Sequence, residues 1–123
     1  MAECVGFLLT SLPVADFMTS SPPILYPRLL LTGAAGGLGR VLRPRLKPHC
    51  NTLRVSDISE LGAAGSGEEV MPVPLQDAQA VDKLLEGVDG VVHLGGVSVE
   101  RPFDEILPAN IVGMYNLYEA ARK

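Results

Sequence analysis

The sequence predicts an α/β fold, a parallel sheet truncated to about four strands with helices on both faces. Two observations predict it. Short apolar runs alternate along the chain with stretches whose apolar residues recur at helical spacing, which is typical of parallel strands joined by helical crossovers. The first apolar run, RLLLTG, leads into three regularly spaced glycines, Gly33, Gly36 and Gly39. A strand that turns at once into a helix through such glycines makes the expected fold Rossmann-like.

Length and composition indicate one domain and exclude several classes of function. The 123 residues carry a net charge of −4, whereas nucleic-acid-binding domains usually present a clustered basic face, so no nucleic-acid partner is expected. Cys4 and Cys50 are isolated, which indicates neither a metal site nor a disulfide framework and favours a cytoplasmic location. No apolar run approaches the ~18 residues that span a bilayer, so we expect no membrane association.

The first 27 residues are expected to form a poorly ordered extension, and residues 28–123 a nucleotide-binding Rossmann half-domain. Residues 5–15 are the only candidate targeting signal, but Glu3 stands where such a signal has basic residues. Residues 19–28 contain three prolines, which suits an arm better than a regular element.

The first half of the domain begins with a strand over residues 28–33 and a helix over residues 37–47. The helix places four apolar residues on one side: Leu38, Val41, Leu42 and Leu46. Pro44 removes an amide from the helix, so we expect a kink or an early end there. The basic residues of this segment are interpreted as a solvated helix face: Arg40, Arg43, Arg45 and Lys47. A second strand is expected within the segment of residues 52–59, ending at Asp57.

In the second half, a flexible loop precedes a short strand over residues 70–75. A helix follows, with Asp77 as its N-cap and Gly87 as a left-handed C-cap residue. Residues 90–96 form a fourth apolar strand. Its outer edge would be unpaired, and an unpaired apolar edge favours homo-oligomers or aggregation. The last element is a long helix with Pro108 in its first turn.

The three glycines have a chemical use at this position. A helix that starts directly after a buried strand points its free N–H groups and positive dipole end at the edge of the sheet. Gly33 permits the tight turn, Gly36 lets the backbone approach a diphosphate, and Gly39 lets the helix pack closely on the strand. Glycine-rich turns without a ligand are also common, so placement after a buried strand is what favours a nucleotide.

Asp57 and two further glycines add to this pattern. Asp57 closes the next strand, where a carboxylate can accept hydrogen bonds from both hydroxyls of an adenosine ribose and repel a 2′-phosphate, favouring NAD over NADP. The alternative is a turn or helix-capping aspartate. Gly95 and Gly96 end the fourth strand, where backbone can approach the diphosphate and the nicotinamide ribose. His93 is a candidate acid–base residue but is interpreted as a packed histidine of an apolar strand.

These motifs resemble a known family. TGAAGGLG at residues 32–39 resembles the T-G-x-x-G-x-x-G fingerprint of extended short-chain dehydrogenases/reductases, the NAD-dependent epimerase/dehydratase family. Residues 91–122, which include GGVSVE, resemble more narrowly the bacterial uronate dehydrogenases. The resemblance covers residues 28–123.

The resemblance implies NAD as cofactor and a role for individual residues. Diphosphate contacts are implied for Gly37 and Leu38, and adenosine ribose contacts for Asp57 and Ile58. Leu75 would lie beside the adenine. The nicotinamide side would be lined by the segment that includes Leu94, Gly95, Gly96 and Ser98. Ser98 would also touch a uronic acid, and Asn110 would support the active site from behind, or bond nearby backbone, or both.

Two departures from the family pattern stand out. Pro74 occupies the position where the family has an aspartate that binds the adenine amino group, and Asp77 comes too late to replace it. The family's catalytic Tyr-x-x-x-Lys pair has no counterpart, because Tyr115 and Tyr118 are followed four residues later by Glu119 and Arg122. Both tyrosines are interpreted as helix packing, and no catalytic residue is assigned.

The resemblance therefore implies the NAD-binding portion of a uronate dehydrogenase-like oxidoreductase, which would convert a hexuronate to an aldarolactone with NAD as hydride acceptor. Because the catalytic pair is missing, we expect this chain alone to be inactive. The alternatives are a stand-alone nucleotide-binding or interaction module, an inactive truncated product, and a fragment of a sugar-nucleotide epimerase or dehydratase.

Overall fold

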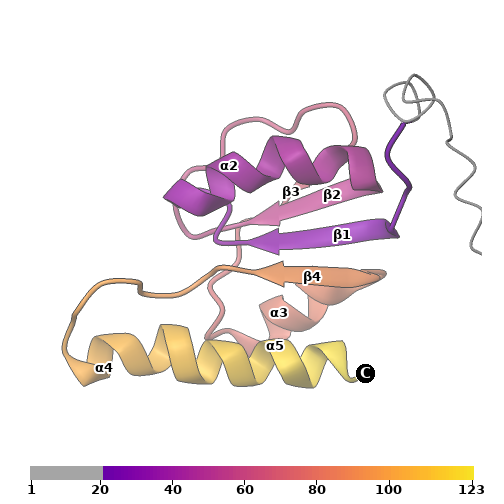
Figure 1. Ribbon diagram of the computed structural model, residues 1–123. Coiled ribbons are helices and arrows are strands. Elements are labelled where there is room, and N and C mark those ends of the chain that lie inside the picture. Colours follow the sequence, from indigo (N-terminus) through magenta and orange to yellow (C-terminus); the bar gives the residue numbers. More distant parts are fainter. Residues whose placement is uncertain (1–20) are drawn as a thin grey trace, which may run out of the picture.

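The computed structural model describes residues 21–123 (Figure 1). The candidate targeting segment and most of the expected extension lie outside the described residues. The elements follow the predicted order of strand, helix, strand, strand, helix, strand and helix: β1 (Tyr26–Thr32), α2 (Gly37–Leu46), η1 (Lys47–His49), β2 (Cys50–Ser56), β3 (Glu68–Val70), α3 (Ala78–Leu85), β4 (Gly90–His93), α4 (Phe103–Ile106), η2 (Leu107–Val112) and α5 (Gly113–Ala121).

The sheet is parallel and four-stranded, with the order β3-β2-β1-β4. Helix α2 covers one face, and α3 and α5 cover the other (Figure 1). The predicted Rossmann-like fold is thus confirmed. The chain passes from β1 to β2 on one side of β1 and later returns to β4 on the other side. Open α/β sheets bind ligands at such a switch point, outside the carboxyl ends of the strands.

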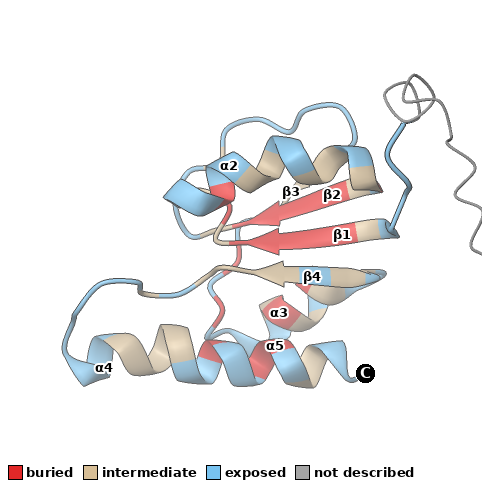
Figure 2. Ribbon diagram, in the orientation of Figure 1, coloured by how far each residue is buried: buried red, intermediate tan, exposed pale blue. Residues whose placement is uncertain are grey.

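The core consists of two apolar clusters, one on each face of the sheet. The cluster beneath α2 contains Leu29, Leu31, Leu53 and Val55, with Leu42 and Leu46 of the helix packed against it. The other cluster joins Leu30 to the helices α3 and α5 through Val81, Leu84 and Leu117. Buried residues accordingly concentrate in β1, β2 and the inner faces of the helices (Figure 2). Burial on both faces explains why β1 is continuously apolar.

Helix α2 packs on the sheet through fewer residues than predicted. Leu38 and Val41 are 59% and 48% exposed, so the expectation that they join Leu42 on the buried side was wrong. The closest approach is made by Gly39, where an added Cβ would collide with the carbonyl oxygen of Gly33. The helix runs through Pro44 and ends two residues later at Leu46, where the 3₁₀ turn η1 begins.

Arg43 is not part of a solvated face, which corrects the interpretation of that basic segment. Its Nε and Nη2 donate to the two carboxylate oxygens of Glu68 at 3.1 and 2.8 Å, and its Nη1 donates to the Leu61 carbonyl at 2.6 Å. The Arg43 hydrogen bonds lower the Glu68 pKa to about 2. Arg43 thus fastens α2 to the start of β3 through Glu68 and to the preceding loop through the Leu61 carbonyl.

All four strands differ from their predicted bounds. Strand β2 begins at Cys50 and ends at Ser56, one residue before Asp57. Strand β3 covers Glu68–Val70 instead of residues 70–75, because Pro72 and Pro74 have no N–H to donate to a ladder. Strand β1 begins at Tyr26, which pairs with Cys50, so its first two residues come from the expected extension. Strand β4 ends at His93.

The C-terminal helical run begins at Phe103, five residues before the predicted start. Pro108 therefore lies inside the run, within the π-helical turn η2, where the amide of Gly113 donates to the Pro108 carbonyl. Proline cannot donate in a helix interior, and wider π turns are one way in which a helix accommodates such a defect.

Tyr115 and Tyr118 are 65% and 70% exposed, so their interpretation as packing residues was wrong. The buried residues of α5 are Gly113, Asn116 and Leu117, which lie on the opposite side of the helix. Across residues 21–123, no helix is both long and apolar enough to cross a membrane.

Candidate functional site

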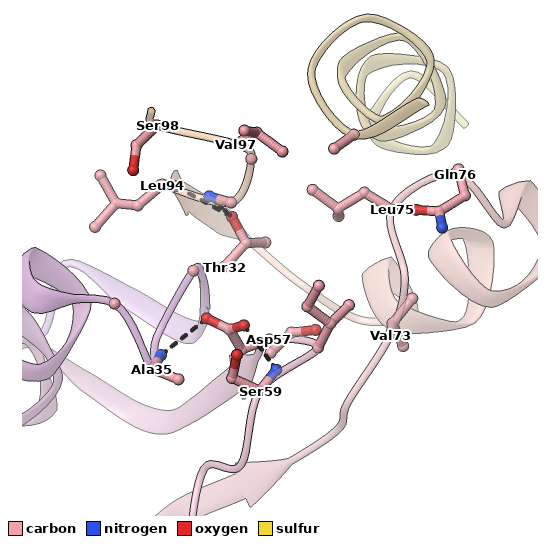
Figure 3. Close-up of a pocket in the computed structure, with 17 residues that line it drawn as sticks. Thr32, Ala35, Asp57, Ser59, Val73, Leu75, Gln76, Leu94, Val97 and Ser98 are labelled. Carbon is pink, nitrogen blue, oxygen red and sulfur yellow. Dashed lines mark hydrogen bonds between the residues drawn. The ribbon is translucent and has the colours of Figure 1, made fainter. Parts of the chain in front are cut away.

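A cleft of about 320 Å³ opens at the carboxyl ends of the strands. It is lined by the turn after β1, the end of β2 with the residues that follow, residues 73–76, residues 94–98, and Ala109 of η2. Figure 3 shows these segments facing one another across the cleft. Every wall belongs to a connection at the switch point, where the fold predicts a ligand.

The glycine turn divides into residues that the fold needs and residues that leave space. Gly33 has φ +68°, and an added Cβ would lie 2.5 Å from the Leu94 carbonyl carbon, so a side chain is excluded there. A side chain is also excluded at Gly39, because its Cβ would collide with the Gly33 carbonyl oxygen. A Cβ on Gly36 would meet only the Gly33 carbonyl oxygen at 3.3 Å, and a Cβ on Gly37 would meet nothing within 4 Å. Packing therefore does not explain the small size of Gly37, and at Gly36 it imposes a single tight contact, with the Gly33 carbonyl oxygen.

Of the predicted diphosphate residues, Gly33 and Gly36 line the cleft, whereas Gly37, Leu38 and Gly39 do not. Gly37, Leu38 and Gly39 form the first turn of α2 behind the cleft wall. Gly36 is the N-cap residue of α2. Because glycine has no side chain, it offers no acceptor to the free backbone amides of the first turn.

Asp57 joins the glycine turn to the end of β2. Its Oδ2 accepts from the Ala35 amide and its Oδ1 from the Ser59 amide, each at 3.0 Å (Figure 3). Asp57 is thus a turn aspartate, the alternative that the sequence left open, and it also lines the cleft. A carboxylate oxygen has a second lone pair, so this geometry leaves acceptor capacity for ribose hydroxyls. Ile58 lines the cleft and is 80% exposed.

Asp57 is the one charged side chain among the cleft-lining residues of the described chain. No lysine or arginine reaches the wall, so an anionic ligand would depend on backbone amides and the α2 dipole for its stabilisation. The other polar side chains of the wall belong to threonine, serine and glutamine. Across residues 21–123, no group of three or more His, Cys, Asp and Glu residues could hold a metal ion.

The segment after β4 is held from two sides. From β1, the Thr32 hydroxyl accepts from the amides of Leu94 and Gly95 at 3.1 and 3.2 Å and lies 2.6 Å from His93 Nδ1. From η2, Asn110 makes two hydrogen bonds to the backbone of Val97.

In the Asn110 contact, Oδ1 accepts from the Val97 amide at 2.7 Å and Nδ2 donates to the Val97 carbonyl at 2.9 Å. Asn110 thus bonds nearby backbone, and by doing so it fixes the segment that carries Gly95, Gly96 and Ser98. All three line the cleft together with Leu94. Thr32 was not singled out from the sequence, although its place in the fingerprint was a signal for it.

The wall formed by residues 73–76 is held from α5. Leu75 is buried, and its carbonyl accepts from Asn116 Nδ2 at 3.0 Å. Asp77 caps α3 by accepting from the Ala80 amide at 3.0 Å, so its carboxylate is engaged away from the cleft. Gln76 lines the cleft instead (Figure 3). Sequence reasoning missed Gln76 and Asn116. The one signal for Asn116 was that it is a polar residue among the apolar residues of α5.

Ser56 gives the cleft a further polar group. Its Oγ is buried and has no hydrogen-bond partner in the described structure. By contrast, neither Tyr115 nor Tyr118 lines the cleft, in keeping with the absence of a tyrosine–lysine pair in the sequence.

Comparison with known proteins fits this geometry. Residues 29–123 match the NAD dependent epimerase/dehydratase family. The chain is 60% identical over 111 residues to a uronate dehydrogenase of Pseudomonas syringae pv. tomato, an alignment that covers 89% of this chain and 40% of that protein. The predicted resemblance to uronate dehydrogenases is thereby confirmed.

Solved structures show the same similarity to uronate dehydrogenases. A mutant uronate dehydrogenase from Agrobacterium tumefaciens complexed with NAD has a TM-score of 0.76 and 59% identity, covering 77% of this chain and 36% of that one. Glucuronic acid dehydrogenase from Chromohalobacter salexigens has a TM-score of 0.78 and 57% identity, covering 80% of this chain and 37% of that one. The chain thus spans two fifths or less of the length of these relatives. It belongs to the NAD dependent epimerase/dehydratase family.

Proposed function

We propose that this chain, through residues 28–123, is the NAD-binding portion of a uronate dehydrogenase-like oxidoreductase. The observation that carries the proposal is the cleft at the switch point, with Asp57 as its single charge and a glycine turn opening into it. Support also comes from the relative complexed with NAD, which is 59% identical over 77% of this chain.

The adenosine half of NAD would occupy the side of the cleft formed by β2 and residues 73–76. Asp57 would accept hydrogen bonds from the ribose hydroxyls, and Ile58 and Leu75 would contact the adenine. Because its two amide contacts fix the Asp57 carboxylate before a ligand arrives, little side-chain freedom is lost on binding. The same carboxylate would repel a 2′-phosphate, so NAD is favoured over NADP.

The diphosphate would lie against the glycine turn, with Gly36 and Gly37 permitting close approach of the backbone and Leu38 and Gly39 forming the helix turn behind it. The nicotinamide side would be lined by the segment from Leu94 to Ser98. Its two anchors, Thr32 and Asn110, lie on different elements.

In the whole protein, the bound NAD would accept a hydride from a hexuronate and yield an aldarolactone. Ser98 would touch the uronic acid, and Asn110 would hold the Ser98 segment in place. The general base of the family is a tyrosine paired with a lysine, and no tyrosine or lysine lines the described cleft. This chain would therefore supply the cofactor cradle and part of the substrate wall.

Cellular context follows the same reasoning. Cys50 is a buried free thiol, which suits a reducing cytoplasm. Strand β4 is an edge strand of the described sheet, and we propose that its unpaired side is a contact for a second copy when the chain is isolated.

The direct test is isothermal calorimetry of the chain with NAD, with NADP and with nicotinamide mononucleotide. We expect saturable binding of NAD, weaker binding of NADP, and little binding of the mononucleotide, which lacks the adenosine that Asp57 and Leu75 would hold. A chain that binds none of the three at millimolar concentration would contradict the proposal and favour an interaction module or an inactive product.

A further inference from the structure

The Thr32 hydroxyl has three polar neighbours at the mouth of the sheet. It lies 3.1 Å from the Leu94 amide, 3.2 Å from the Gly95 amide and 2.6 Å from His93 Nδ1. Thr32 and His93 are register partners on β1 and β4, so their side chains meet across the two strands whose ends open the cleft.

Counting protons fixes the role of each group. A hydroxyl has one hydrogen to donate and two lone pairs to accept with, and a backbone amide can only donate. The amides of Leu94 and Gly95 therefore take both lone pairs of the Thr32 hydroxyl, and the Leu94 amide is shared with the Thr32 carbonyl oxygen at 3.3 Å. The hydroxyl hydrogen is left for His93, so Nδ1 accepts it. An imidazole that accepts at Nδ1 is neutral and carries its proton on Nε2.

We infer that His93, in this neutral tautomer, is a positioning residue for the cleft, because it orients the Thr32 hydroxyl that holds the Leu94–Ser98 segment. The inference rests on the proposed function, since that segment lines the nicotinamide side of the NAD site. His93 acts through Thr32 and touches no ligand in this role.

The surroundings of His93 favour the neutral ring. Partial burial lowers the pKa of His93 below its usual value. On the neighbouring strand β1, the charged residue is Arg28, which lies at the opposite end and is paired with Glu69. The buried residues of α5, which covers this face of the sheet, are Gly113, Asn116 and Leu117, and none of them is charged.

Protonation of His93 would break the arrangement. A proton on Nδ1 turns that atom from an acceptor into a donor, and three donors would then face the two lone pairs of Thr32. One of the two amides must lose its bond to the Thr32 hydroxyl, and since the Leu94 amide keeps the Thr32 carbonyl oxygen as an acceptor, the segment is held less tightly by β1 without leaving it. Asn110 would still hold the segment at Val97, so the effect is a loosening and not a collapse.

The first experiment is nuclear magnetic resonance of the 123-residue chain without nucleotide, which makes it independent of NAD binding. Imidazole ¹⁵N shifts, assigned by loss of the signal in His93→Asn, should show the neutral ring protonated on Nε2. The amide signals of Leu94 and Gly95 should move with the same midpoint as His93 as the pH is lowered. Protonation on Nδ1, or amides that do not follow His93, would overturn the inference.

Thr32→Val and Thr32→Ser form a matched pair for the same measurement. Valine keeps the shape and removes the hydroxyl, so the amides should no longer follow His93. Serine keeps the hydroxyl and should preserve the coupling. Coupling that survives in Thr32→Val would show that His93 acts on the segment without Thr32.

The second experiment follows NAD affinity with pH. Loss of one amide hydrogen bond, worth about 1 kcal/mol, should weaken NAD binding about fivefold as the pH falls through the His93 titration. In His93→Asn, the side-chain oxygen can accept the Thr32 hydrogen without titrating, so the pH step should vanish. A pH step of equal size in His93→Asn would overturn the inference. Absence of NAD binding at every pH would instead contradict the proposed function, and the resonance experiment would still decide the role of His93.

Discussion

Asp57 Oδ2 accepts a hydrogen bond from the Ala35 amide at 3.0 Å, joining the end of β2 to the glycine turn that follows β1. The two walls of the cleft that would hold the adenosine ribose and the diphosphate are therefore parts of one hydrogen-bonded unit. A substitution at Asp57 acts on the geometry of the turn as well as on the ligand, and a test must separate these effects.

Asp57→Asn removes the negative charge and keeps one oxygen, which can accept from one of the two turn amides, while the other amide loses its acceptor. We expect its NAD affinity to fall moderately and its preference for NAD over NADP to shrink, because repulsion between a carboxylate and a 2′-phosphate is worth on the order of 1 kcal/mol or more in a partly buried site. Calorimetry with both cofactors measures the ratio. Asp57→Ala, which also loses the turn contacts, serves as the comparison, and an unchanged ratio in both variants would remove Asp57 from the ribose role.

Gly36→Val should abolish NAD binding and leave the fold intact, since an added Cβ meets only the Gly33 carbonyl oxygen at 3.3 Å while the side chain would occupy space needed by the diphosphate. Gly39→Val is the matched control and should unfold the domain, because its Cβ would collide with backbone. Circular dichroism and calorimetry distinguish the two results. If folded Gly36→Val binds NAD like the parent, the glycine serves the turn alone.

Asn110→Leu should lower stability and also weaken NAD binding. The variant leaves the Val97 amide and carbonyl without their partners at 2.7 and 2.9 Å, and an unmade buried hydrogen bond costs about 1–3 kcal/mol. Asn116→Leu is the comparison, because it frees the Leu75 carbonyl on the adenine side. Thermal unfolding and calorimetry of both variants, with nucleotides that lack either the adenosine or the nicotinamide half, would show whether each asparagine serves its own end of the cleft.

The Arg43–Glu68 pair predicts an acid-sensitive contribution to stability. The folded-state pKa of Glu68 is lowered from 4.5 to about 2 by hydrogen bonding to Arg43. A depressed carboxylate pKa stabilises the folded state above the unfolded value, and this contribution is lost as the pH falls from about 4.5 towards 2. The free energy of unfolding should decrease over that window, and Glu68→Gln should flatten the decrease. A parallel slope in Glu68→Gln would assign the acid sensitivity to other carboxylates.

The 123-residue chain should produce no NADH from galacturonate or glucuronate, even where it binds NAD. No tyrosine or lysine among residues 21–123 lines the cleft, and a positioned general base alone contributes about 10²–10⁴-fold to a rate. NADH production is measured by absorbance at the NADH band, with each uronate and saturating NAD. Turnover of a uronate by this chain would mean that another group in the cleft acts as the base.

The elements and the site segments could be predicted because each has a local signal. Apolar runs marked β1, β2 and β4, Asp77 marked the start of α3, and the glycine spacing marked the turn after β1. Side-chain partners had no such signal. Arg43 belongs to a run of basic residues that looks solvated, and only the fold brings Glu68, 25 residues away, within hydrogen-bonding distance.

Arg54 shows the same limit from within a strand. It is 9% exposed, and it donates to Glu69 and to the carbonyls of Leu84 and Glu86 at the end of α3. The sequence around Arg54 does not indicate these partners, because they lie 15 to 32 residues away along the chain. The buried face of α5 was misjudged for a related reason, since aromatic residues are usually buried and here glycine and asparagine take the inner side.

The π turn η2 also sets the angular phase of everything that follows it. A turn closed by a bond to the fifth preceding residue contains one residue more than an α turn, so α5 is rotated by about 100° relative to an uninterrupted helix. Closing this turn to a regular α turn without removing a residue would carry Val112 into the place of Gly113. At that place even a Cβ would lie 2.7 Å from the Leu75 Cβ. The extra residue of this turn thus keeps Gly113 against Leu75, and the segment should tolerate substitutions far better than the insertion of a further residue.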